Sequence, residues 1–309
     1  MKLSIVTTLY KSAPYIREFH RRASEAARQL AGEEYEIIMV NDGSPDDSLE
    51  TALCLVEEDM RLKVVDLSRN FGHHKAMMTG LKYARGEWIF LIDVDLEEAP
   101  EWLLPFAAQQ QAQQCDVMYG VQAKRKGKLW ERLSGGLFYK IFNLFSGMPL
   151  PENITTARLM SRRYVKALLQ HREREIYIAG LWHLTGFSQV PQIVTKTSKE
   201  TTTYTLSKKV ALLVNSLTSF SNAPLLGIFY LGVGIFGTAM CYTAYLIIKW
   251  YFLATPPSGW TSVMASIWLL GGLIMLSTGI IGIYVSKVLS EAKKRPYTLI
   301  RAVYKKQEK

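Results

Sequence analysis

Cysteine is scarce in this sequence of 309 residues, which contains only Cys54, Cys115 and Cys241. The three are far apart and no CxxC pair occurs, which argues against a disulfide framework and against a zinc site built on cysteine pairs. The composition therefore favours a reducing compartment or buried, unreactive thiols.

The sequence also lacks an internal repeat, a recognisable nucleic-acid-binding motif and a signal peptide. Its first residues, MKLSIVTTLYKSAP, are too short and too interrupted for a signal peptide, so we expect the first domain to stay cytosolic. The net charge of +10 suits nucleic acid, an anionic membrane or an acidic ligand. The basic residues are concentrated beside the predicted membrane segments described below and in the tail of the chain. We therefore expect no nucleic-acid partner.

Apolar runs alternate with segments of helical periodicity through the first part of the chain. Strands are predicted at residues 3–9, 35–40, 62–67, 88–92 and 116–121, and helices at 12–30, 46–58 and 73–84. This alternation predicts an α/β fold with a doubly wound, mostly parallel sheet and right-handed crossovers.

Polar residues follow each of the first four strands. Because parallel strands end at the same edge of a sheet, these residues should meet where open α/β folds bind ligands. Each cluster alone would more often be an ordinary loop, and their convergence is what indicates a site. The clusters are Tyr10-Lys11, Asn41-Asp42, Arg69-Asn70 and Asp93 with Asp95.

The stretch EWIFLIDVDLEEAPE, residues 87–101, is the strongest of these signals. Asp93 and Asp95 lie two positions apart after a buried strand, with Glu97 close behind. Neighbouring carboxylates repel each other unless a cation lies between them, and Mg²⁺ or Mn²⁺ commonly joins carboxylates to substrate phosphates. For a DxD motif alone, a solvated acidic turn remains the alternative.

Two segments have the periodicity of amphipathic helices. Residues 129–145 carry an apolar, aromatic stripe beside the basic loop 124–128, and residues 206–222 form a second such segment. A core-facing helix is the ordinary interpretation of the first. We favour a helix in the membrane interface, because basic and aromatic residues flank it.

Residues 223–248 and 260–286 contain no charged side chain. At about 1.5 Å per residue, each exceeds a hydrocarbon core of roughly 30 Å, so a two-helix transmembrane hairpin is predicted; a soluble helical hairpin is the alternative. The tail 287–309 is strongly basic, whereas the loop between the two runs has only Lys249. The positive-inside rule then places both termini in the cytosol.

Several longer motifs together resemble one known family. They are SIVTTLY, EIIMVNDGSPDDS, LSRNFGHHKAMMTGLKYARGEWIFLIDVDLEEAPE, DVMYGV, RLMSRR, TSFSNAPL and KRPYTLI. The chain is similar to family 2 glycosyltransferases with the GT-A fold, and more narrowly to polyprenyl-phosphate glycosyltransferases such as dolichol-phosphate mannose synthases and the bactoprenol glucosyltransferases of O-antigen modification. The resemblance covers nearly the whole chain and implies an inverting, Mg²⁺- or Mn²⁺-dependent enzyme.

The resemblance also implies roles for individual residues. Asp93 and Asp95 match the carboxylates that hold the metal and the diphosphate, and Glu97 matches a third, metal-proximal position. The catalytic residues implied are Asp93, Asp95 and Arg158. The nucleotide-sugar site adds Thr8, Tyr10, Asp42 and Arg69, and the acceptor phosphate is expected at Arg125, Arg132 and Arg158.

Three positions depart from the family pattern: Ser12, Gln122 and Thr156. At Thr156 the family often has an acid near the acceptor. A lipid phosphate is already an anion near pH 7 and needs little general-base help, whereas a sugar hydroxyl needs a positioned base. The loss therefore suits a phosphate acceptor, and it leaves open whether acceptor choice or activity has changed.

The sequence thus predicts sugar transfer from a nucleotide sugar, UDP-linked by preference, to undecaprenyl phosphate or a related polyprenyl phosphate. The alternatives are transfer to a hydroxyl of a lipid-linked glycan and a non-catalytic nucleotide- or lipid-binding partner. The expected organisation is a cytosolic domain at 1–205, a juxtamembrane helix at 206–222, a hairpin at 223–286 and a cytosolic tail at 287–309. We expect a homo-oligomer in the plasma (inner) membrane.

Overall fold

The computed structural model describes residues 1–122, 153–174, 176–196, 223–253 and 259–306. The chain divides into two compact units. The first contains a large sheet with its covering helices, and it includes Arg295–Lys309 from the end of the chain. The second contains two long helices, α9 (Ala223–Leu253) and α10 (Trp260–Ala292).

The first unit is built on an eight-stranded sheet with the order β7-β5-β6-β4-β1-β2-β3-β8. The apolar runs at its centre form strands because they are buried on both faces, as the continuous burial of β1, β2 and β3 shows. The strands are β1 (Leu3–Leu9), β2 (Tyr35–Asn41), β3 (Leu62–Leu67), β4 (Trp88–Leu91), β5 (Val117–Gln122), β6 (Ile154–Ser161), β7 (Gln189–Val194) and β8 (Ile300–Lys305).

The sheet is mixed, with most of its strands in one direction. Strands β4, β1, β2 and β3 are parallel to one another, as predicted, and β7 pairs parallel with β5. Strand β6 pairs antiparallel with both β4 and β5, and β8 pairs antiparallel with β3 at the other edge. These two exceptions come from parts of the chain outside the alternating strand–helix rhythm.

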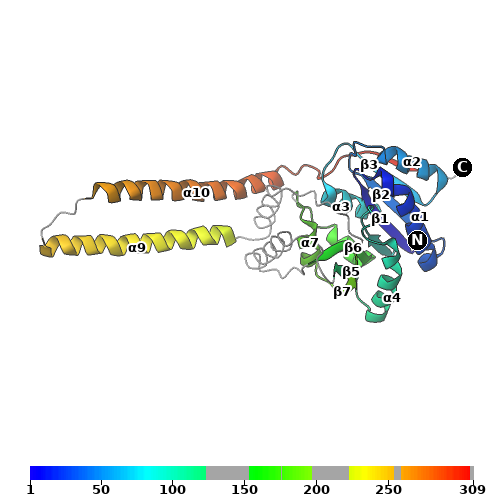
Figure 1. Ribbon diagram of the computed structural model, residues 1–309, viewed down its shortest axis with the longest axis horizontal. Coiled ribbons are helices and arrows are strands. Elements are labelled where there is room, and N and C mark those ends of the chain that lie inside the picture. Colours follow the sequence, from blue (N-terminus) through cyan, green and yellow to red (C-terminus); the bar gives the residue numbers. More distant parts are fainter. Residues whose placement is uncertain (123–152, 175, 197–222, 254–258, 307–309) are drawn as a thin grey trace. The chain divides into compact units, whose positions relative to one another are not determined.

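Helices cover both faces of the sheet (Figure 1). On one face, α1 (Ala13–Ala31) contacts α2 (Ser48–Glu58), α4 (Leu103–Gln113) and the short 3-10 helix η1 (Pro100–Trp102). On the other, α3 (His73–Tyr83) packs against β1, β2 and β4, and α6 (Arg162–Leu168) packs against β4 and β6. The short helix α7 (Ile178–Leu184) precedes β7. This packing leaves the carboxyl ends of the four parallel strands in register at one edge of the sheet.

Within the described residues, α10 contains one stretch long and apolar enough to cross a membrane, Leu269–Ala292. A shorter apolar stretch, Pro224–Ala239, lies in α9. The predicted interfacial helix at 129–145 and juxtamembrane helix at 206–222 lie outside the described residues. One candidate span is therefore found, and the two-span hairpin stays a prediction.

Candidate functional site

The DVD motif lies just beyond the end of β4, at the carboxyl edge of the sheet. The strand ends at Leu91, and the chain turns sharply afterwards because Leu96 adopts a left-handed conformation with φ 63°. The turn is held by the Glu97 N–H, which donates to Oδ1 of Asp95 at 3.1 Å. Asp93 and Asp95 therefore leave the sheet within one tight turn, as the sequence predicts.

Asp93 is linked to the end of β1 through a histidine. Its Oδ1 is 3.2 Å from Nε2 of His73, the first residue of α3. The other ring nitrogen of His73, Nδ1, is 2.9 Å from the hydroxyl of Thr8 in β1. The predicted donor residue Thr8 and the predicted metal ligand Asp93 are thus joined through a histidine that was not among the predicted site residues.

The electrostatics of this pair favour two charges. Burial by itself raises the pKa of a carboxyl, but the neighbouring His73 outweighs it and lowers the pKa of Asp93 below its usual range. Burial likewise opposes a charged imidazole, yet Asp93 raises the pKa of His73. Asp93 is therefore an anion at neutral pH, and its charge favours the protonated, cationic form of His73.

Glu98 is fully buried behind the DVD turn and connects three segments of the chain. Its two carboxyl oxygens accept hydrogen bonds from the backbone N–H groups of Thr156 and Ala157, at 3.0 and 2.7 Å. Lys196, beyond β7, forms an ion pair with it at 2.6 Å. Burial and the charge of Asp93 raise the pKa of Glu98 to about 7, while Lys196 opposes the shift.

Sequence reasoning missed this function of Glu98 and the contribution of Lys196. Glu98 was visible as a second acid behind the motif, but its partners lie on β6 and after β7, far along the chain. Thr156, where the family pattern has an acid, supplies a backbone N–H to Glu98 and also lowers the pKa of Asp93 through its hydroxyl. A carboxylate is thus present near this position, contributed by residue 98.

Asp42 occupies the end of β2 with its side chain buried. Its two carboxyl oxygens accept the backbone N–H groups of Phe71 and Gly72, at 2.7 and 3.0 Å. Burial raises its pKa, although these two hydrogen bonds oppose the shift. Asp42 thereby fastens the loop after β3, on which Arg69 is exposed, and Tyr10 is exposed after β1.

Arg158 lies in β6, beside Leu91 of β4, and is buried. Its guanidinium stacks on the ring of Trp182 and contacts the backbone carbonyls of Thr155 and Thr156, each at 3.4 Å. Burial lowers its pKa to about 9. A ligand could reach this arginine only if Trp182 moved aside. The other predicted phosphate ligands, Arg125 and Arg132, lie outside the described residues.

The positions that depart from the family pattern have structural partners. Ser12 precedes α1, and its hydroxyl accepts the Tyr10 N–H at 3.1 Å while its own N–H donates to Ser48 at 2.9 Å. Gln122 ends β5, with its N–H bonded to the carbonyl of Asn153 at 3.0 Å. Ser12 therefore supports the loop that presents Tyr10.

The three predicted metal ligands are not assembled into a complete protein site. Among the described residues, no group of three or more His, Cys, Asp or Glu side chains is arranged to hold a metal ion. Asp93 Oδ1 is in contact with Nε2 of His73 at 3.2 Å, and a divalent ion at this oxygen would take the place of the imidazole. The residues fit an ion shared between one or two carboxylates and a ligand phosphate, the usual arrangement for Mg²⁺.

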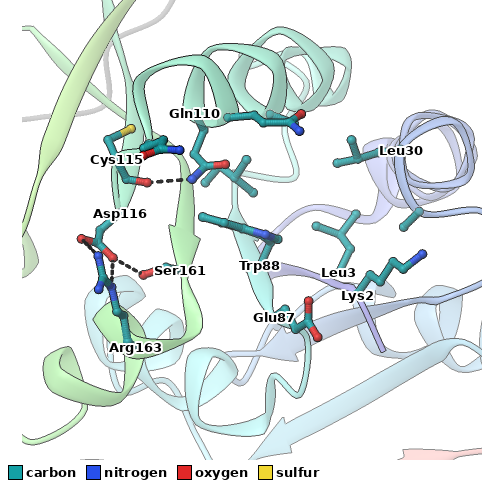
Figure 2. Close-up of a pocket in the computed structure, with 15 residues that line it drawn as sticks. Lys2, Leu3, Leu30, Glu87, Trp88, Gln110, Cys115, Asp116, Ser161 and Arg163 are labelled. Carbon is teal, nitrogen blue, oxygen red and sulfur yellow. Dashed lines mark hydrogen bonds and ion pairs between the residues drawn. The ribbon is translucent and has the colours of Figure 1, made fainter.

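A separate cleft of about 590 Å³ lies at the opposite, amino edge of the sheet. It is lined by Leu3, Trp88 and residues around the start of β5, none of which were predicted as site residues. Figure 2 shows that several of its polar groups bond one another: Gln110 donates to the Cys115 carbonyl at 2.7 Å, and Arg163 and Ser161 both bond Asp116.

Comparisons with known proteins match this chain along nearly its whole length. Residues 4–169 match the model of glycosyl transferase family 2. A protein of Mycobacterium tuberculosis described as a glycosyltransferase is 51% identical over 98% of this chain and 89% of its own length. The prophage bactoprenol glucosyl transferase homolog of Escherichia coli is 30% identical, over 99% of this chain and 100% of its own length.

The sheet also resembles solved structures. Glucosyl-3-phosphoglycerate synthase from Mycobacterium tuberculosis, in a structure with Mn²⁺, UDP and glucosyl-3-phosphoglycerate, aligns with a TM-score of 0.50. The alignment covers 72% of this chain and 81% of that chain, at 16% identity. At this identity the likeness supports the fold alone.

Proposed function

Because the chain belongs to glycosyl transferase family 2, we propose that it transfers a sugar from a UDP-linked donor to a polyprenyl phosphate. The observation that carries the proposal is that Asp93, His73 and Thr8 lie in contact at the carboxyl edge of the sheet, beside the exposed Tyr10 and Arg69. Relatives named bactoprenol glucosyl transferase that align over the full chain support a polyprenyl-phosphate acceptor.

The donor nucleotide binds across the ends of β1, β2 and β3 in this proposal. Tyr10 and Arg69 are exposed there, and the buried Asp42 holds the intervening loop in place. Thr8 borders the same edge through its contact with His73. The donor diphosphate then lies next to the DVD turn.

Asp93 and Asp95, with Glu97 beside them, would hold Mg²⁺ or Mn²⁺ together with the donor phosphates. A bound divalent ion neutralises the charge that develops on the departing diphosphate. His73 and Lys196 add positive charge from the protein: one lies at Asp93 and the other at Glu98. Their positions keep the acidic turn from repelling an anionic donor.

An oxygen of the lipid phosphate attacks the anomeric carbon of the sugar in line with the leaving group. The new carbon–oxygen bond forms as the bond to the nucleoside diphosphate breaks, which inverts the anomeric configuration. The attacking phosphate needs no proton removed at neutral pH, so a side-chain base is dispensable. Arg158, and Arg125 and Arg132 outside the described residues, are proposed to bind the acceptor phosphate, because the arginine fork fits phosphate oxygens.

We further propose that the sheet unit acts at the cytosolic face of the plasma membrane, anchored by α9 and α10 as a two-span hairpin. The candidate span in α10 and the basic residues after it favour this orientation. Cell-surface glycan modification, such as that of O-antigen, is the proposed purpose, and a homo-oligomer is the proposed assembly.

The test uses the purified full-length chain in detergent with undecaprenyl phosphate, Mn²⁺ and a panel of UDP- and GDP-linked sugars. The expected result is a glycolipid whose sugar–phosphate bond is cleaved by mild acid, formed with one UDP-sugar and lost when the metal is chelated. An acid-stable product would favour a hydroxyl acceptor instead. Nucleotide binding without turnover on any donor would favour a non-catalytic partner protein.

A further inference from the structure

Strand β8, which follows α10, contacts the proposed donor edge through the side chain of Arg301. Arg301 of β8 lies 3.3 Å from Oδ2 of Asp66, and its guanidinium donates to the carbonyl of Ser68 at 2.8 Å. Asp66 is buried at the end of β3, and Ser68 begins the loop 68–72. The N–H of Ser68 is also bonded to the carbonyl of Leu299 at 2.9 Å.

Asp66 connects Arg301 to the end of the neighbouring strand, β2. Its Oδ1 accepts a buried hydrogen bond from the amide of Asn41 at 2.8 Å. The carbonyl oxygen of the Asn41 side chain in turn accepts the N–H of Ser44 at 3.2 Å, and the hydroxyl of Ser44 accepts the N–H of Lys11 at 2.7 Å. A continuous chain of polar contacts therefore runs from Arg301 to the loop that carries Tyr10.

The loop 68–72 is held from its other side by β2. Asp42 accepts the N–H groups of Phe71 and Gly72, and Gly43, with φ 60°, lies against the loop backbone. A Cβ on Gly43 would be 2.4 Å from the backbone of Arg69 and Asn70. One end of the loop is thus fastened by Asp42 and the other by β8.

We propose that Arg301 is a positioning residue for the donor nucleotide, acting through Asp66 and Ser68. This inference rests on the proposed function, in which the nucleotide binds at Tyr10, Asp42 and Arg69. Asp66 Oδ2 is buried with no hydrogen-bond partner, so Arg301 is the cation that compensates its charge. Without Arg301, the buried carboxylate is left with Asn41 alone, and Ser68 keeps only its N–H bond to Leu299 and loses the one to its carbonyl.

The consequence is that the segment after the second long helix takes part in donor binding. Arg301 touches no expected substrate atom, so its loss should weaken donor affinity and leave the chemical step intact. Partners that share a polar network are energetically coupled, so the effects of changing Asp66 and Arg301 should not add.

The experiment compares the parent chain with Arg301→Gln, Asp66→Asn and the double variant. Lys306→Gln is the matched control, because it removes a positive charge from the same tail, where Lys306 bonds the Glu57 carbonyl of α2 rather than the loop. Hydrogen exchange of the amides of residues 68–72 is measured without nucleotide, and UDP affinity is measured by calorimetry with Mn²⁺. Steady-state kinetics then give kcat and the KM for the donor.

For Arg301→Gln we expect exchange at residues 68–72 to be at least tenfold faster, UDP affinity about tenfold weaker, a matching rise in the donor KM and kcat within twofold of the parent. Asp66→Asn in the same chain should recover part of the affinity, because it removes the uncompensated charge. Lys306→Gln should behave as the parent.

Unchanged exchange at residues 68–72 in Arg301→Gln would overturn the inference, as would faster exchange spread evenly over the whole sheet. Equal UDP affinity of the parent and Arg301→Gln would also overturn it. Failure of the proposed function has a different signature: the parent itself would bind no nucleoside diphosphate, while the exchange measurement would still report whether Arg301 holds the loop.

Discussion

Buried carboxylates at the two edges of the sheet have different partners. At the amino edge, Glu36 accepts hydrogen bonds from the Ser4 hydroxyl and the Arg85 N–H, both at 2.7 Å, and pairs with Lys63 at 3.2 Å. Asp116 is similarly surrounded by Arg163 and Ser161. At the carboxyl edge, by contrast, Asp93 Oδ1 faces the imidazole of His73, at 3.2 Å, whose charge depends on its protonation.

We interpret the charges of Glu36 and Asp116 as stabilising the fold and the charge of Asp93 as available to bind a ligand. Lysine and arginine stay charged at neutral pH, whereas histidine gains or loses its proton near that pH, so the contact of Asp93 is the one that a bound cation could replace. Despite its cleft of about 590 Å³, the amino edge has its buried acids Glu36 and Asp116 paired with permanently charged groups. The titratable partner of Asp93, rather than the cleft volume, is what indicates the site.

Exchanging a carboxylate for an amide at each edge should produce the largest contrast. Asp93→Asn removes the charge that is proposed to face the metal and the donor phosphates, and we expect the rate of sugar transfer to fall by at least about 100-fold. Asp116→Asn at the amino edge should leave transfer within about twofold of the parent. Initial rates with saturating donor and acceptor measure both, and equal losses would remove the distinction between the edges.

The buried ion pairs offer a second contrast. Lys196→Met leaves Glu98 without its cation and should lower the free energy of unfolding by about 3 kcal/mol; Lys63→Met should have a similar effect through Glu36. Only Lys196→Met is expected to reduce donor affinity as well, because Lys196 lies among the acids of the DVD turn.

Denaturant titration measures the stability of Lys196→Met and Lys63→Met. Calorimetry with a nucleotide measures the donor affinity of both variants. The double variant Glu36→Gln/Lys63→Met should recover stability relative to Lys63→Met, since Oε1 can still accept from Ser4 and Arg85 and no uncompensated charge remains. A Lys63→Met variant that lost nucleotide affinity while remaining folded would contradict the assignment of function to one edge.

Two glycines give a smaller contrast. Gly43 has φ 60° and no room for a Cβ beside the loop backbone, and Gly86 would place a Cβ 2.6 Å from the backbone N of Ser4. Each substitution to alanine should cost about 2 kcal/mol of stability. Gly43→Ala should also raise the donor KM, whereas Gly86→Ala should not, which thermal unfolding combined with donor titration would show.

The smallest effect expected is a pH dependence at the amino edge. The hydrogen bond from Arg163 lowers the pKa of Asp116, against the opposing effect of burial. The unfolded carboxyl therefore binds its proton at a higher pH than the folded one, so the stabilisation is complete above the unfolded pKa and is lost as pH falls through the folded pKa.

Asp116→Asn should remove about 1 kcal/mol at pH 7 and flatten the loss of stability below about pH 4. Denaturation midpoints of the parent and the variant between pH 3 and pH 7 measure the effect. If the variant lost stability with acid as steeply as the parent, other carboxyls would account for the acid sensitivity.

Local patterns were sufficient to predict the parallel core and the DVD turn. The runs that became β1, β2, β3 and β4 are short, apolar and bounded by turn residues, so their burial could be inferred without knowing their neighbours. The polar residues after them had to meet at one edge because parallel strands share a direction. Asp42, Arg69 and Asp93 could therefore be placed at one edge of the sheet, whereas Thr8 was implied only by the family resemblance.

The remaining features depended on contacts between distant segments. Strand β6 lies between β4 and β5, and its pairing with β4 places Arg158 beside Leu91. No local pattern distinguishes the buried position of this arginine from the solvent-facing position of a phosphate ligand. The same holds for β8, whose pairing with β3 joins the end of the chain to a strand far from it in sequence.

The sequence by itself determined that an acidic turn follows a buried strand, because strand burial and turn chemistry are properties of neighbouring residues. Only the tertiary structure decided what surrounds that turn. His73 and Lys196 bring positive charge to it, Glu98 joins it to β6, and Arg301 reaches the adjoining loop from the end of the chain. These contacts join residues far apart in sequence, and they exist because the folded sheet brings its strand ends together.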